Sequence, residues 1–173
     1  GLGDVYKRQE KKSEICRSPG AAWQITCYQK GFETPKWPLG GVMYQIFPDR
    51  FHFSGSRKEN IPQDRTLHED WYETPVWQPN AQGEITNSDF FMGDLEGITQ
   101  KLDYLEELGV TCIYLNPVSE AYSNHRYDTA DYSKIDPLLG TEEDFKTLCA
   151  EAKKRGMHVI NDGVFSHCLL YTS

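Results

Sequence analysis

The sequence predicts an α/β fold in which parallel strands alternate with helices. Three short apolar runs, at 41–47, 110–115 and 157–160, have the β-branched and aromatic composition of buried strands. Two segments between them, 94–108 and 141–155, repeat apolar residues at helical spacing. Strands and helices that alternate in this way form right-handed βαβ units and a parallel sheet. The pattern fits an eight-stranded barrel and a doubly wound sheet equally well.

Both helices are predicted from their apolar face and from their end signals. The apolar residues of the first helix are Leu95, Ile98, Leu102, Leu105 and Leu108. Gly109 follows them as a typical helix stop. The second helix begins with a capping box, in which the Thr141 hydroxyl and the Asp144 carboxylate each satisfy a backbone N–H. Gly156 ends this helix after a basic last turn.

One further strand is predicted upstream, at Trp23–Tyr28, where apolar and polar side chains alternate. The residues after it, through Pro35, Pro38 and Gly40, have a linker-like composition. One strand cannot bury its face alone. We therefore expect this strand to belong to an upstream β-domain that is largely missing from the chain.

Both ends of the chain are predicted to be foreign to the protein. Residues 4–9 and 168–173 can be encoded by DNA strings that are reverse complements of each other over nearly their whole length. These strings resemble the transposon end sequence that is used as an adapter in shotgun sequencing. We therefore exclude residues 1–9 and 168–173 from fold reasoning as adapter-like scars, and expect a genuine segment of about 10–167.

Charge and composition exclude some partners. The net charge of −8 argues against nucleic acid, whose phosphates need a basic face. No apolar run approaches the roughly 18 residues of a membrane span. Outside the scars no cysteine belongs to a C-x-x-C pair, and we expect free thiols in a reducing compartment, the cytoplasm, with disulfides as the alternative. These cysteines are Cys16, Cys27, Cys112 and Cys149.

The stretch Ser123–Tyr132 is the strongest candidate for a site. Its ten residues carry two carboxylates, a His, an Arg, an Asn and two Tyr, without Gly or Pro. It follows a predicted buried strand, and α/β proteins place ligands at the carboxyl ends of their strands, here Asp49, Asn116 and Asp162. A solvated surface loop is the alternative for this stretch taken alone.

A long polar segment without a sustained period separates the first predicted strand from the first helix. It spans 52–93 as an inserted loop, and such a long connection is usually functional or an inserted subdomain. We expect the aromatic packing of Trp71, Tyr72 and Trp77 to hold it in place.

Five ordered motifs resemble the α-amylase superfamily of glycoside hydrolases, above all its neopullulanase, cyclomaltodextrinase and maltogenic-amylase branch. The resemblance extends over about 37–167. The motifs are Tyr44–Phe51, Gly93–Ile98, Tyr114–Pro117, Ser123–Tyr132 and Asp162–His167.

The resemblance implies the N-terminal part of a TIM (β/α)₈ barrel, with its first three units in residues 36–167. Residues 10–35 would be the C-terminal remnant of the β-sandwich module that precedes the barrel in this branch. The implied reaction is retaining hydrolysis, or transfer, at α-glucosidic bonds, by an Asp nucleophile and a Glu acid. Both lie on later barrel strands of the family, so the chain carries no catalytic carboxylate of its own.

What the resemblance assigns to this chain is part of the sugar-binding subsite. Tyr127 matches a Tyr that stacks on the sugar, His167 matches a His that hydrogen-bonds its hydroxyls, and Asn124 and His125 belong to the same binding motif. Asp162 matches an Asp that orients an Arg beside the nucleophile. Without the resemblance, Asp162 and His167 would be a turn residue and a capped His.

No cofactor is expected, and calcium is not expected either. Members of this branch can bind calcium in an Asn/Asp-rich loop after the first motif, together with the later Gly-Asp. Here that loop, 52–58, has no carboxylate and two positive charges, which leaves Asp94 alone among the expected acids. Ser166 also stands where many α-amylases have a calcium-binding Asn.

The implied partner is an α-glucan oligosaccharide, and the branch is compatible with a homodimer formed through the preceding module. Two alternatives remain open. One is a noncatalytic sugar-binding or partner member of the superfamily, and the other is an unrelated α/β enzyme with a chance loop. An Asp two residues after an Arg on the fourth strand, and a Glu that closes the fifth strand, would establish an enzyme.

Overall fold

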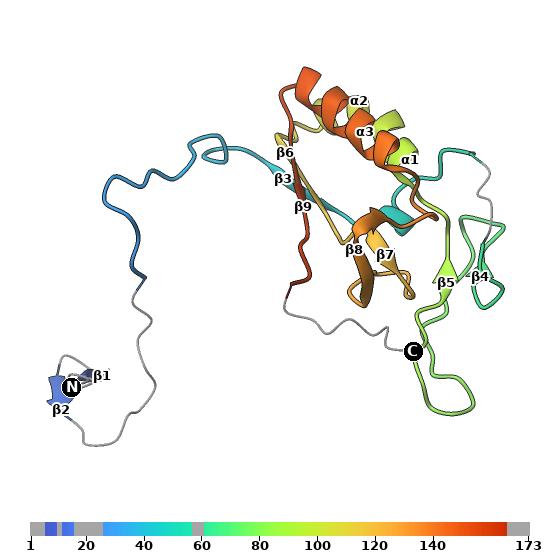
Figure 1. The fold of residues 1–173 in the computed structure, drawn as a ribbon, viewed down its shortest axis with the longest axis horizontal. Coiled ribbons are helices and arrows are strands. Elements are labelled where there is room, and N and C mark those ends of the chain that lie inside the picture. The colour runs from blue at the N-terminus through green and yellow to red at the C-terminus, as the bar shows by residue number, and fades with distance from the viewer. Residues whose placement is uncertain (1–5, 10–11, 16–25, 57–60, 166–173) are drawn as a thin grey trace. The chain divides into compact units, whose positions relative to one another are not determined.

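The computed structural model describes residues 6–9, 12–15, 26–56 and 61–165 (Figure 1). The chain divides into two compact units, Gly1–Pro35 and Lys36–Ser173. In the first unit, strand β1 (Tyr6–Gln9) pairs antiparallel with β2 (Lys12–Ile15).

The strand predicted at Trp23–Tyr28 is not formed over the part that the structure describes. Residues 26–28 have no regular structure and are exposed, whereas 23–25 lie outside the described residues. A strand needs a hydrogen-bonding neighbour, and none of the described residues pairs with 26–28. The β-sandwich remnant and the adapter-like scars stay predictions.

The second unit is built on a three-stranded parallel sheet in the order β3–β6–β9. These strands are β3 (Met43–Ile46), β6 (Cys112–Leu115) and β9 (His158–Asn161). Each lies within the predicted run or one residue beyond it, so the parallel α/β arrangement is confirmed. Ile46 lies beside Leu115, which in turn lies beside Asn161, so the three strands end in register.

Three helices connect these strands. They are α1 (Leu95–Gln100), α2 (Leu102–Glu107) and α3 (Glu142–Lys154). The predicted capping box of α3 is present, with Thr141 and Asp144 bonded reciprocally. The prediction of one continuous first helix was wrong, because the backbone of Lys101 leaves helical geometry and its N–H turns to Ile98 and Thr99 carbonyls.

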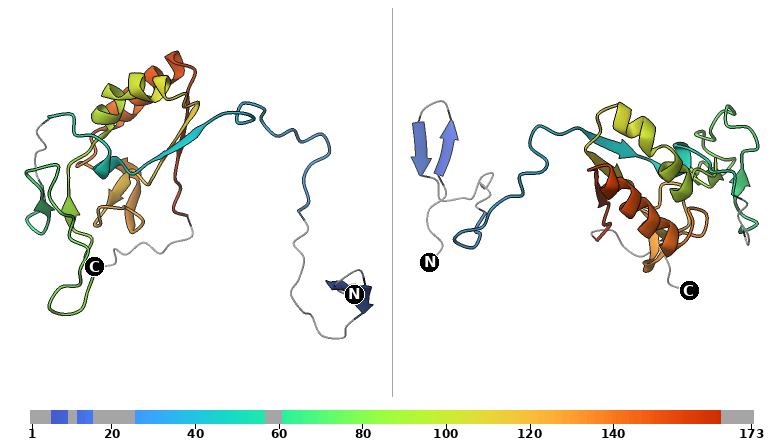
Figure 2. Two further views of the ribbon diagram at one scale, coloured as in Figure 1. Left: turned by 180° about the vertical axis from the view of Figure 1, so that it is seen from behind. Right: turned by 90° about the horizontal axis from the view of Figure 1, so that it is seen from above.

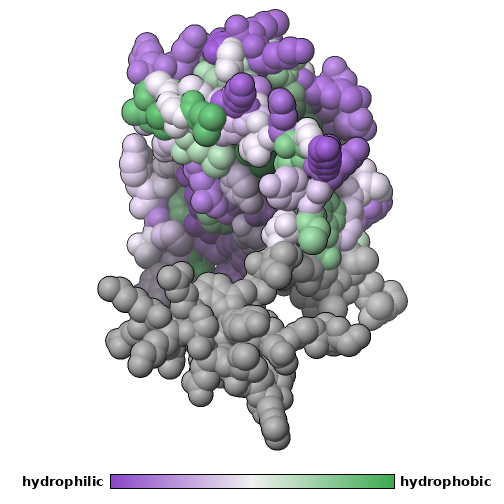
Figure 3. Space-filling view, turned by 90° about the vertical axis from the view of Figure 1, so that its left-hand side faces the viewer, coloured by the Kyte–Doolittle hydropathy of each residue, from purple (hydrophilic) through white to green (hydrophobic). Residues whose placement is uncertain are grey.

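The helices lie together on one face of the sheet (Figures 1 and 2). Strand residues of alternate positions join the helix residues there in one apolar core. Its fully buried members include Ile46, Leu95, Ile98, Leu102, Leu105, Ile113, Leu115 and Leu148. On the other side of the sheet Met43 is 54% exposed. At the top of Figure 3, the surface is mostly hydrophilic, with some hydrophobic side chains among the hydrophilic ones.

Two small sheets lie in the loops that follow β3 and β6. In the long loop, β4 (Thr66–Leu67) pairs in parallel with β5 (Asp89–Phe90). After β6, β7 (Ser119–Ala121) pairs antiparallel with β8 (Thr129–Ile135), with register shifts between Ser119 and Ala121. Residues 122–128 are therefore the connection of a hairpin, which the sequence did not predict.

The junction of the long loop with α1 explains the Gly-Asp pair at 93–94. A Cβ on Gly93 would lie 2.2 Å from the carbonyl oxygen of Pro48, so only glycine fits. The buried carboxylate of Asp49 accepts the N–H groups of Phe91 and Met92, both at 3.1 Å. Asp94 caps α1 by accepting the Gly97 N–H. Asp49 therefore serves this junction and does not face a ligand position, which corrects its expected placement.

The long loop is held by charged groups rather than by the three predicted aromatics. Asp89, 3% exposed, binds Arg50 at 3.2 Å, His68 at 3.1 Å and the Val76 N–H at 3.0 Å. The second ring nitrogen of His68 lies 2.8 Å from Glu73.

The outcome for the aromatics is mixed. Trp71 makes an edge contact with Phe91 at 5.9 Å between ring centroids. Tyr72 and Trp77 are 91% and 67% exposed, so their predicted packing role was wrong.

His68 gives the loop a pH-dependent contribution to stability. Burial opposes its charged form, but hydrogen bonds to Glu73 and Asp89 outweigh burial, and the pKa of His68 lies above its ordinary 6.5. A group whose pKa is higher in the folded than in the unfolded state stabilises the fold fully at a pH below its unfolded-state pKa. This stabilisation is lost as pH rises through its folded-state pKa. We expect the unfolding free energy of the chain minus that of His68→Gln to shrink as pH rises from the ordinary histidine pKa of 6.5 through the raised pKa of the folded state.

Urea denaturation of both proteins at each pH measures this difference. Taking the difference matters because the pKa of His125 is lowered, chiefly by burial, so its contribution to stability grows as pH rises. A difference that is constant or grows with pH would contradict the assigned role of His68.

Candidate functional site

The candidate site lies at the carboxyl ends of the sheet strands. The ladder continues one residue beyond the strands, because Asn116 N–H donates to Ile46 at 2.9 Å and Asp162 N–H donates to Leu115 at 3.0 Å. The carboxyl ends of β6 and β9 therefore place Asn116 and Asp162 at one edge of the sheet. The hairpin loop that carries His125 and Tyr127 leads back to the same edge.

Tyr127 is joined to Asp162 by a hydrogen bond from its hydroxyl to the carboxylate, at 2.8 Å. Burial, together with this bond and the charge of Asp162, raises the pKa of Tyr127 to about 12. Asp162 also raises the pKa of Tyr114, a residue of β6, by a hydrogen bond. Two phenols thus converge on one carboxylate and remain protonated donors at neutral pH.

His125 is fixed as a neutral imidazole that donates from Nε2. Its Nδ1 accepts the backbone N–H of Tyr127 at 3.1 Å, which requires that Nδ1 carry no proton. The Ser123 hydroxyl lies 3.0 Å from the same Nδ1. Burial is the main cause that lowers the pKa of His125, although the charge of Asp128 opposes it. His125 therefore has an Nε2–H to donate, and the Asn87 amide nitrogen, 3.4 Å from Nε2, is itself a donor and does not accept it.

Asn124 is placed differently from the other predicted substrate-binding residues. It is 6% exposed, and its amide donates to the Asp89 carbonyl and carboxylate, both at 3.0 Å. Its backbone N–H also donates to Asn87 at 2.8 Å. This geometry makes Asn124 the tie between the hairpin loop and the long loop.

Sequence reasoning missed the buried ion pair behind this loop. Arg126 is 0% exposed and lies between His125 and Tyr127, with a left-handed φ of 61°. Its guanidinium donates to the Asn124 carbonyl at 2.8 Å and pairs with Asp136 at 3.1 Å. Asp136 also accepts the Leu138 N–H at 2.9 Å. The only sequence signal was an Arg without a role in an otherwise site-like stretch.

His167, the last predicted site residue, lies outside the described residues, and so does Ser166. The described chain before them is held against β8, because the Tyr132 hydroxyl donates to the Val164 carbonyl at 2.7 Å. The described residues 162–165 therefore leave β9 alongside the hairpin.

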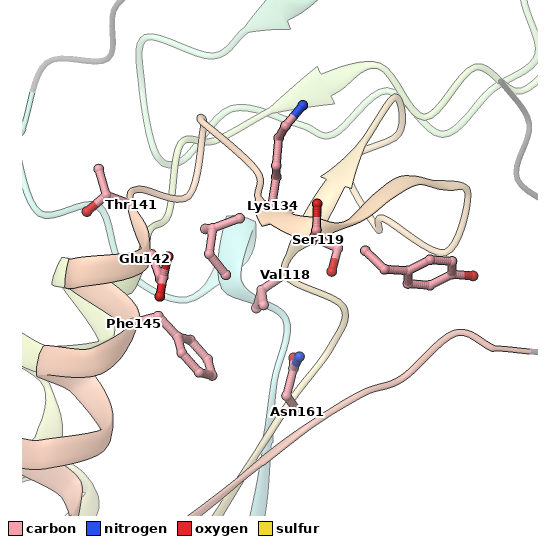
Figure 4. A pocket seen from close by; sticks show the side chains of 10 residues that line it. Val118, Ser119, Lys134, Thr141, Glu142, Phe145 and Asn161 are labelled. Atoms are coloured by element: carbon pink, nitrogen blue, oxygen red, sulfur yellow. The ribbon is translucent and has the colours of Figure 1, made fainter.

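A separate pocket lies between the hairpin, the start of α3 and the end of β9 (Figure 4). Val118, Ser119 and Lys134 line its hairpin side, and Glu142 and Phe145 line its helix side. The lining does not include His125, Tyr127 or Asp162. This pocket is therefore distinct from the candidate sugar-contact residues.

The loop that was considered for calcium has its one expected acid engaged in protein contacts. Asp94 accepts the Gly97 N–H at 2.6 Å and the Ser54 hydroxyl at 2.7 Å. No group of three or more His, Cys, Asp or Glu side chains suited to a metal occurs among the residues that the structure describes. The expectation that calcium is not bound stays a prediction.

Three of the four expected thiols can be followed, and within the described part of the chain each is free. Cys27 is exposed, Cys112 is buried and Cys149 is half-buried, while Cys16 lies outside the described residues. Burial raises the pKa of the Cys112 and Cys149 thiols. Neither thiol belongs to the candidate site. No helix among the described residues is long and apolar enough to span a bilayer.

Parallel βα units, with polar and aromatic residues gathered at the strand ends, define an α/β protein of the kind that binds ligands at this edge. Residues 45–170 match the family described as "Alpha amylase, catalytic domain". The chain belongs to the α-amylase family. This match confirms the predicted resemblance. Relatives of the chain are named maltogenic amylase, cyclomaltodextrinase and neopullulanase.

Two curated relatives show the extent of the match. The chain is 47% identical over 160 residues to an amylopullulanase of Thermoanaerobacterium saccharolyticum, a match that covers 84% of this chain and 12% of the relative. It is 44% identical over 136 residues to an intracellular maltogenic amylase of Bacillus subtilis, a match that covers 79% of this chain and 21% of the relative. The chain therefore spans about an eighth to a fifth of the length of these relatives.

Solved structures show the same relationship. A cyclic α-maltosyl-(1→6)-maltose hydrolase of Arthrobacter globiformis, in complex with cyclic α-maltosyl-(1→6)-maltose, is 41% identical with a TM-score of 0.63, over 78% of this chain and 27% of its own. The type III pullulan hydrolase of Thermococcus kodakarensis is 38% identical with a TM-score of 0.64, and the match covers 80% of this chain and 25% of the hydrolase. The fold is accordingly that of part of a TIM-barrel glycoside hydrolase.

Proposed function

We propose that this chain is part of a retaining glycoside hydrolase that acts on α-glucosidic bonds of starch-derived oligosaccharides, pullulan or cyclodextrins. Within that enzyme it supplies part of the sugar-binding subsite and none of the catalytic acids. The observation that carries the proposal is the convergence of Tyr127 and Asp162 at the edge of the sheet, with His125 fixed beside them.

Each of these side chains suits a neutral sugar. The ring of Tyr127 offers an aromatic plane to the apolar face of a pyranose, while its hydroxyl is held by Asp162. The Nε2–H of His125 can donate to a sugar hydroxyl, since the backbone fixes Nδ1 as the acceptor. His167 is proposed to hydrogen-bond sugar hydroxyls, and Asp162 to orient an Arg near the nucleophile. Asn124 is proposed to support the loop.

The remaining features of the complete protein are proposals as well. A β-sandwich module precedes the barrel, and a homodimer formed through that module is compatible with the branch. The complete protein works in the cytoplasm and without calcium in the loop after Phe51. Metal dependence is checked by the thermal midpoint in excess EDTA and in millimolar calcium.

The function is tested on the complete protein, obtained by extending the gene beyond the printed sequence. We expect hydrolysis of maltotriose, pullulan or cyclodextrin, with an Asp two residues after an Arg on the fourth strand and a Glu closing the fifth. A complete protein without these acids and without hydrolysis, but with affinity for maltotriose, would instead be a noncatalytic sugar-binding member of the superfamily.

The 173-residue chain by itself is expected to hydrolyse no α-glucan. The expected nucleophile and acid are absent from it, so the covalent step is lost and not merely substrate binding. Incubation of the purified chain with maltotriose, pullulan and cyclodextrin, followed by reducing-sugar assay, measures this. Product above a buffer control would show that the chain carries catalytic groups that we have not identified.

A further inference from the structure

Ser123 and Asp128 are bonded to each other across the hairpin loop that carries His125. The Ser123 N–H donates to the Asp128 carboxylate at 3.1 Å, and the Ser123 hydroxyl donates to the same carboxylate. The Arg126 N–H donates to the Ser123 hydroxyl oxygen at 3.1 Å. Ser123 is 4% exposed, so its hydroxyl relies on these protein partners and not on water. The hydroxyl proton therefore lies toward Asp128, since a carboxylate can only accept.

The same hydroxyl contacts the imidazole of His125, 3.0 Å from Nδ1. In the neutral imidazole Nδ1 has a lone pair, with which it accepts the Tyr127 N–H at 3.1 Å. The hydroxyl has a single proton, which it gives to Asp128. In the neutral state the contact between Nδ1 and Ser123 therefore joins two acceptors and holds no proton.

A proton that binds to Nδ1 would complete this contact. The two atoms already lie at hydrogen-bond distance, so Nδ1–H would donate to the Ser123 hydroxyl oxygen, which in turn donates to Asp128. The charge of the imidazolium would then be linked to a carboxylate through one hydroxyl. In exchange, the Tyr127 N–H would lose its bond to Nδ1. Protonation of His125 is thus coupled to the backbone of Tyr127.

The charged residues of the hairpin loop act on His125 in opposite directions. Burial is the largest cause and lowers the pKa of His125, the charge of Asp128 raises it, and the guanidinium of Arg126 lowers it. The net pKa lies below the ordinary 6.5, so the neutral imidazole persists to a lower pH than usual. Among these causes, Asp128 alone favours the imidazolium.

The neighbouring elements face His125 with uncharged groups. From the long loop, the Asn87 amide lies 3.4 Å from Nε2. The ring of Tyr127 lies beside the imidazole, at 5.8 Å between centroids, and its phenol stays neutral because its pKa is raised to about 12. Asp162, at the end of β9, binds that phenol at 2.8 Å and is not among the groups that shift the pKa of His125.

We propose that Ser123 and Asp128 are positioning residues for His125. Through the Ser123 hydroxyl, the Asp128 carboxylate holds the ring by its Nδ1 edge, which leaves Nε2–H for a sugar hydroxyl. The same pair accepts Nδ1–H at acid pH, so protonation breaks the Tyr127 N–H bond and weakens the sugar contact. This inference deepens the proposed function and rests on it for the identity of the ligand.

An NMR titration of the 173-residue chain, followed through the imidazole nitrogen signals, tests the role of Asp128 without sugar. The signals of His125 are those missing from His125→Gln. We expect the pKa of His125 to be lower in Asp128→Asn than in the unchanged chain, because asparagine keeps an acceptor for Ser123 but removes the negative charge. Asp103→Asn is the matched control, because Asp103 is an exposed carboxylate on α2, and it should leave this pKa unchanged.

The unchanged chain gives a second test that does not depend on the folding of a variant. At high pH the ring proton should be on Nε2, and the amide signal of Tyr127 should shift over the same pH range as His125. At acid pH the Nδ1–H should exchange slowly with water, since Ser123 is buried. An Asp128→Asn titration equal to that of the unchanged chain, a neutral ring protonated on Nδ1, or a Tyr127 amide that ignores the titration would each overturn the proposal.

The affinity of the complete protein for maltotriose, measured by calorimetry at the same pH values, separates this inference from the proposed function. We expect the affinity to fall as pH falls through the pKa of His125, and this fall to move to lower pH in Asp128→Asn. Constant affinity while His125 titrates would overturn the pH coupling. If Asp128 shifts the titration but maltotriose does not bind at any pH, the positioning role stands and the proposed function fails. If maltotriose binds and Asp128→Asn leaves the titration unchanged, the proposed function stands and this inference fails.

Discussion

Replacing Arg126 by methionine is expected to destabilise the chain by about 3–5 kcal/mol. The substitution removes a guanidinium that is 0% exposed and leaves the carboxylate of Asp136, 3% exposed, without its charged partner. It also leaves the Asn124 carbonyl without its donor. This loss is a large share of the roughly 5–15 kcal/mol that stabilises a typical domain. Urea denaturation followed by circular dichroism measures it.

Two further variants show whether the burial of the pair is the cause. Lys134→Met removes a comparable pair, at 3.1 Å from Asp131, but its side chain is 65% exposed and the urea midpoint should hardly move. Arg126→Met/Asp136→Asn removes both charges and keeps an acceptor, so it should recover part of the lost stability. An Arg126→Met chain as stable as Lys134→Met would contradict this account of the loop.

Replacing Tyr127 by alanine in the complete protein is expected to lower kcat/KM for maltotriose by about a hundredfold. Alanine removes the aromatic plane and the hydroxyl that donates to Asp162 at 2.8 Å. A hydrogen bond to a charged group contributes about 1.5–3 kcal/mol, so Tyr127→Phe alone should cost about tenfold. Initial rates over a range of maltotriose concentrations measure both variants.

The two variants divide the role of Tyr127 between its ring and its hydroxyl. The sequence predicts stacking alone for Tyr127, and the structure adds the bond to Asp162. Equal losses for Ala and Phe would remove stacking from the account, whereas full activity of the Phe variant would show that the hydroxyl bond is dispensable. The control is Tyr104→Phe, a substitution at an exposed position, which should leave kcat and KM unchanged.

Most of the fold could be predicted from local sequence patterns. The strands end within one residue of the ends of the apolar runs, and the capping box at Thr141 places the start of α3, because these features depend on neighbouring residues only. The hairpin after β6 had no comparable signal, since β7 has three residues and an irregular register. The break at Lys101 also lies inside an uninterrupted helical pattern.

The buried charges could not be predicted from local pattern. Asp49, Asp89, Arg126 and Asp136 are all nearly inaccessible, whereas charged residues are usually exposed. Their partners are assembled by the fold. Asp89, for example, meets Arg50, 39 residues earlier, and Asn124, 35 residues later. Local pattern likewise predicts a packing role for the aromatic residues of the long loop, because it does not show that distant charged residues hold this loop. In the structure Tyr72 and Trp77 are exposed.

The most direct test of the proposed subsite is a crystal structure of the complete protein with maltotriose bound. We expect one glucose unit to lie parallel to the ring of Tyr127, with a sugar hydroxyl within about 3 Å of Nε2 of His125. The hydroxyl of Tyr127 should still bind Asp162. A maltotriose that binds at the catalytic acids while His125 and Tyr127 remain out of contact with it would contradict the central claim.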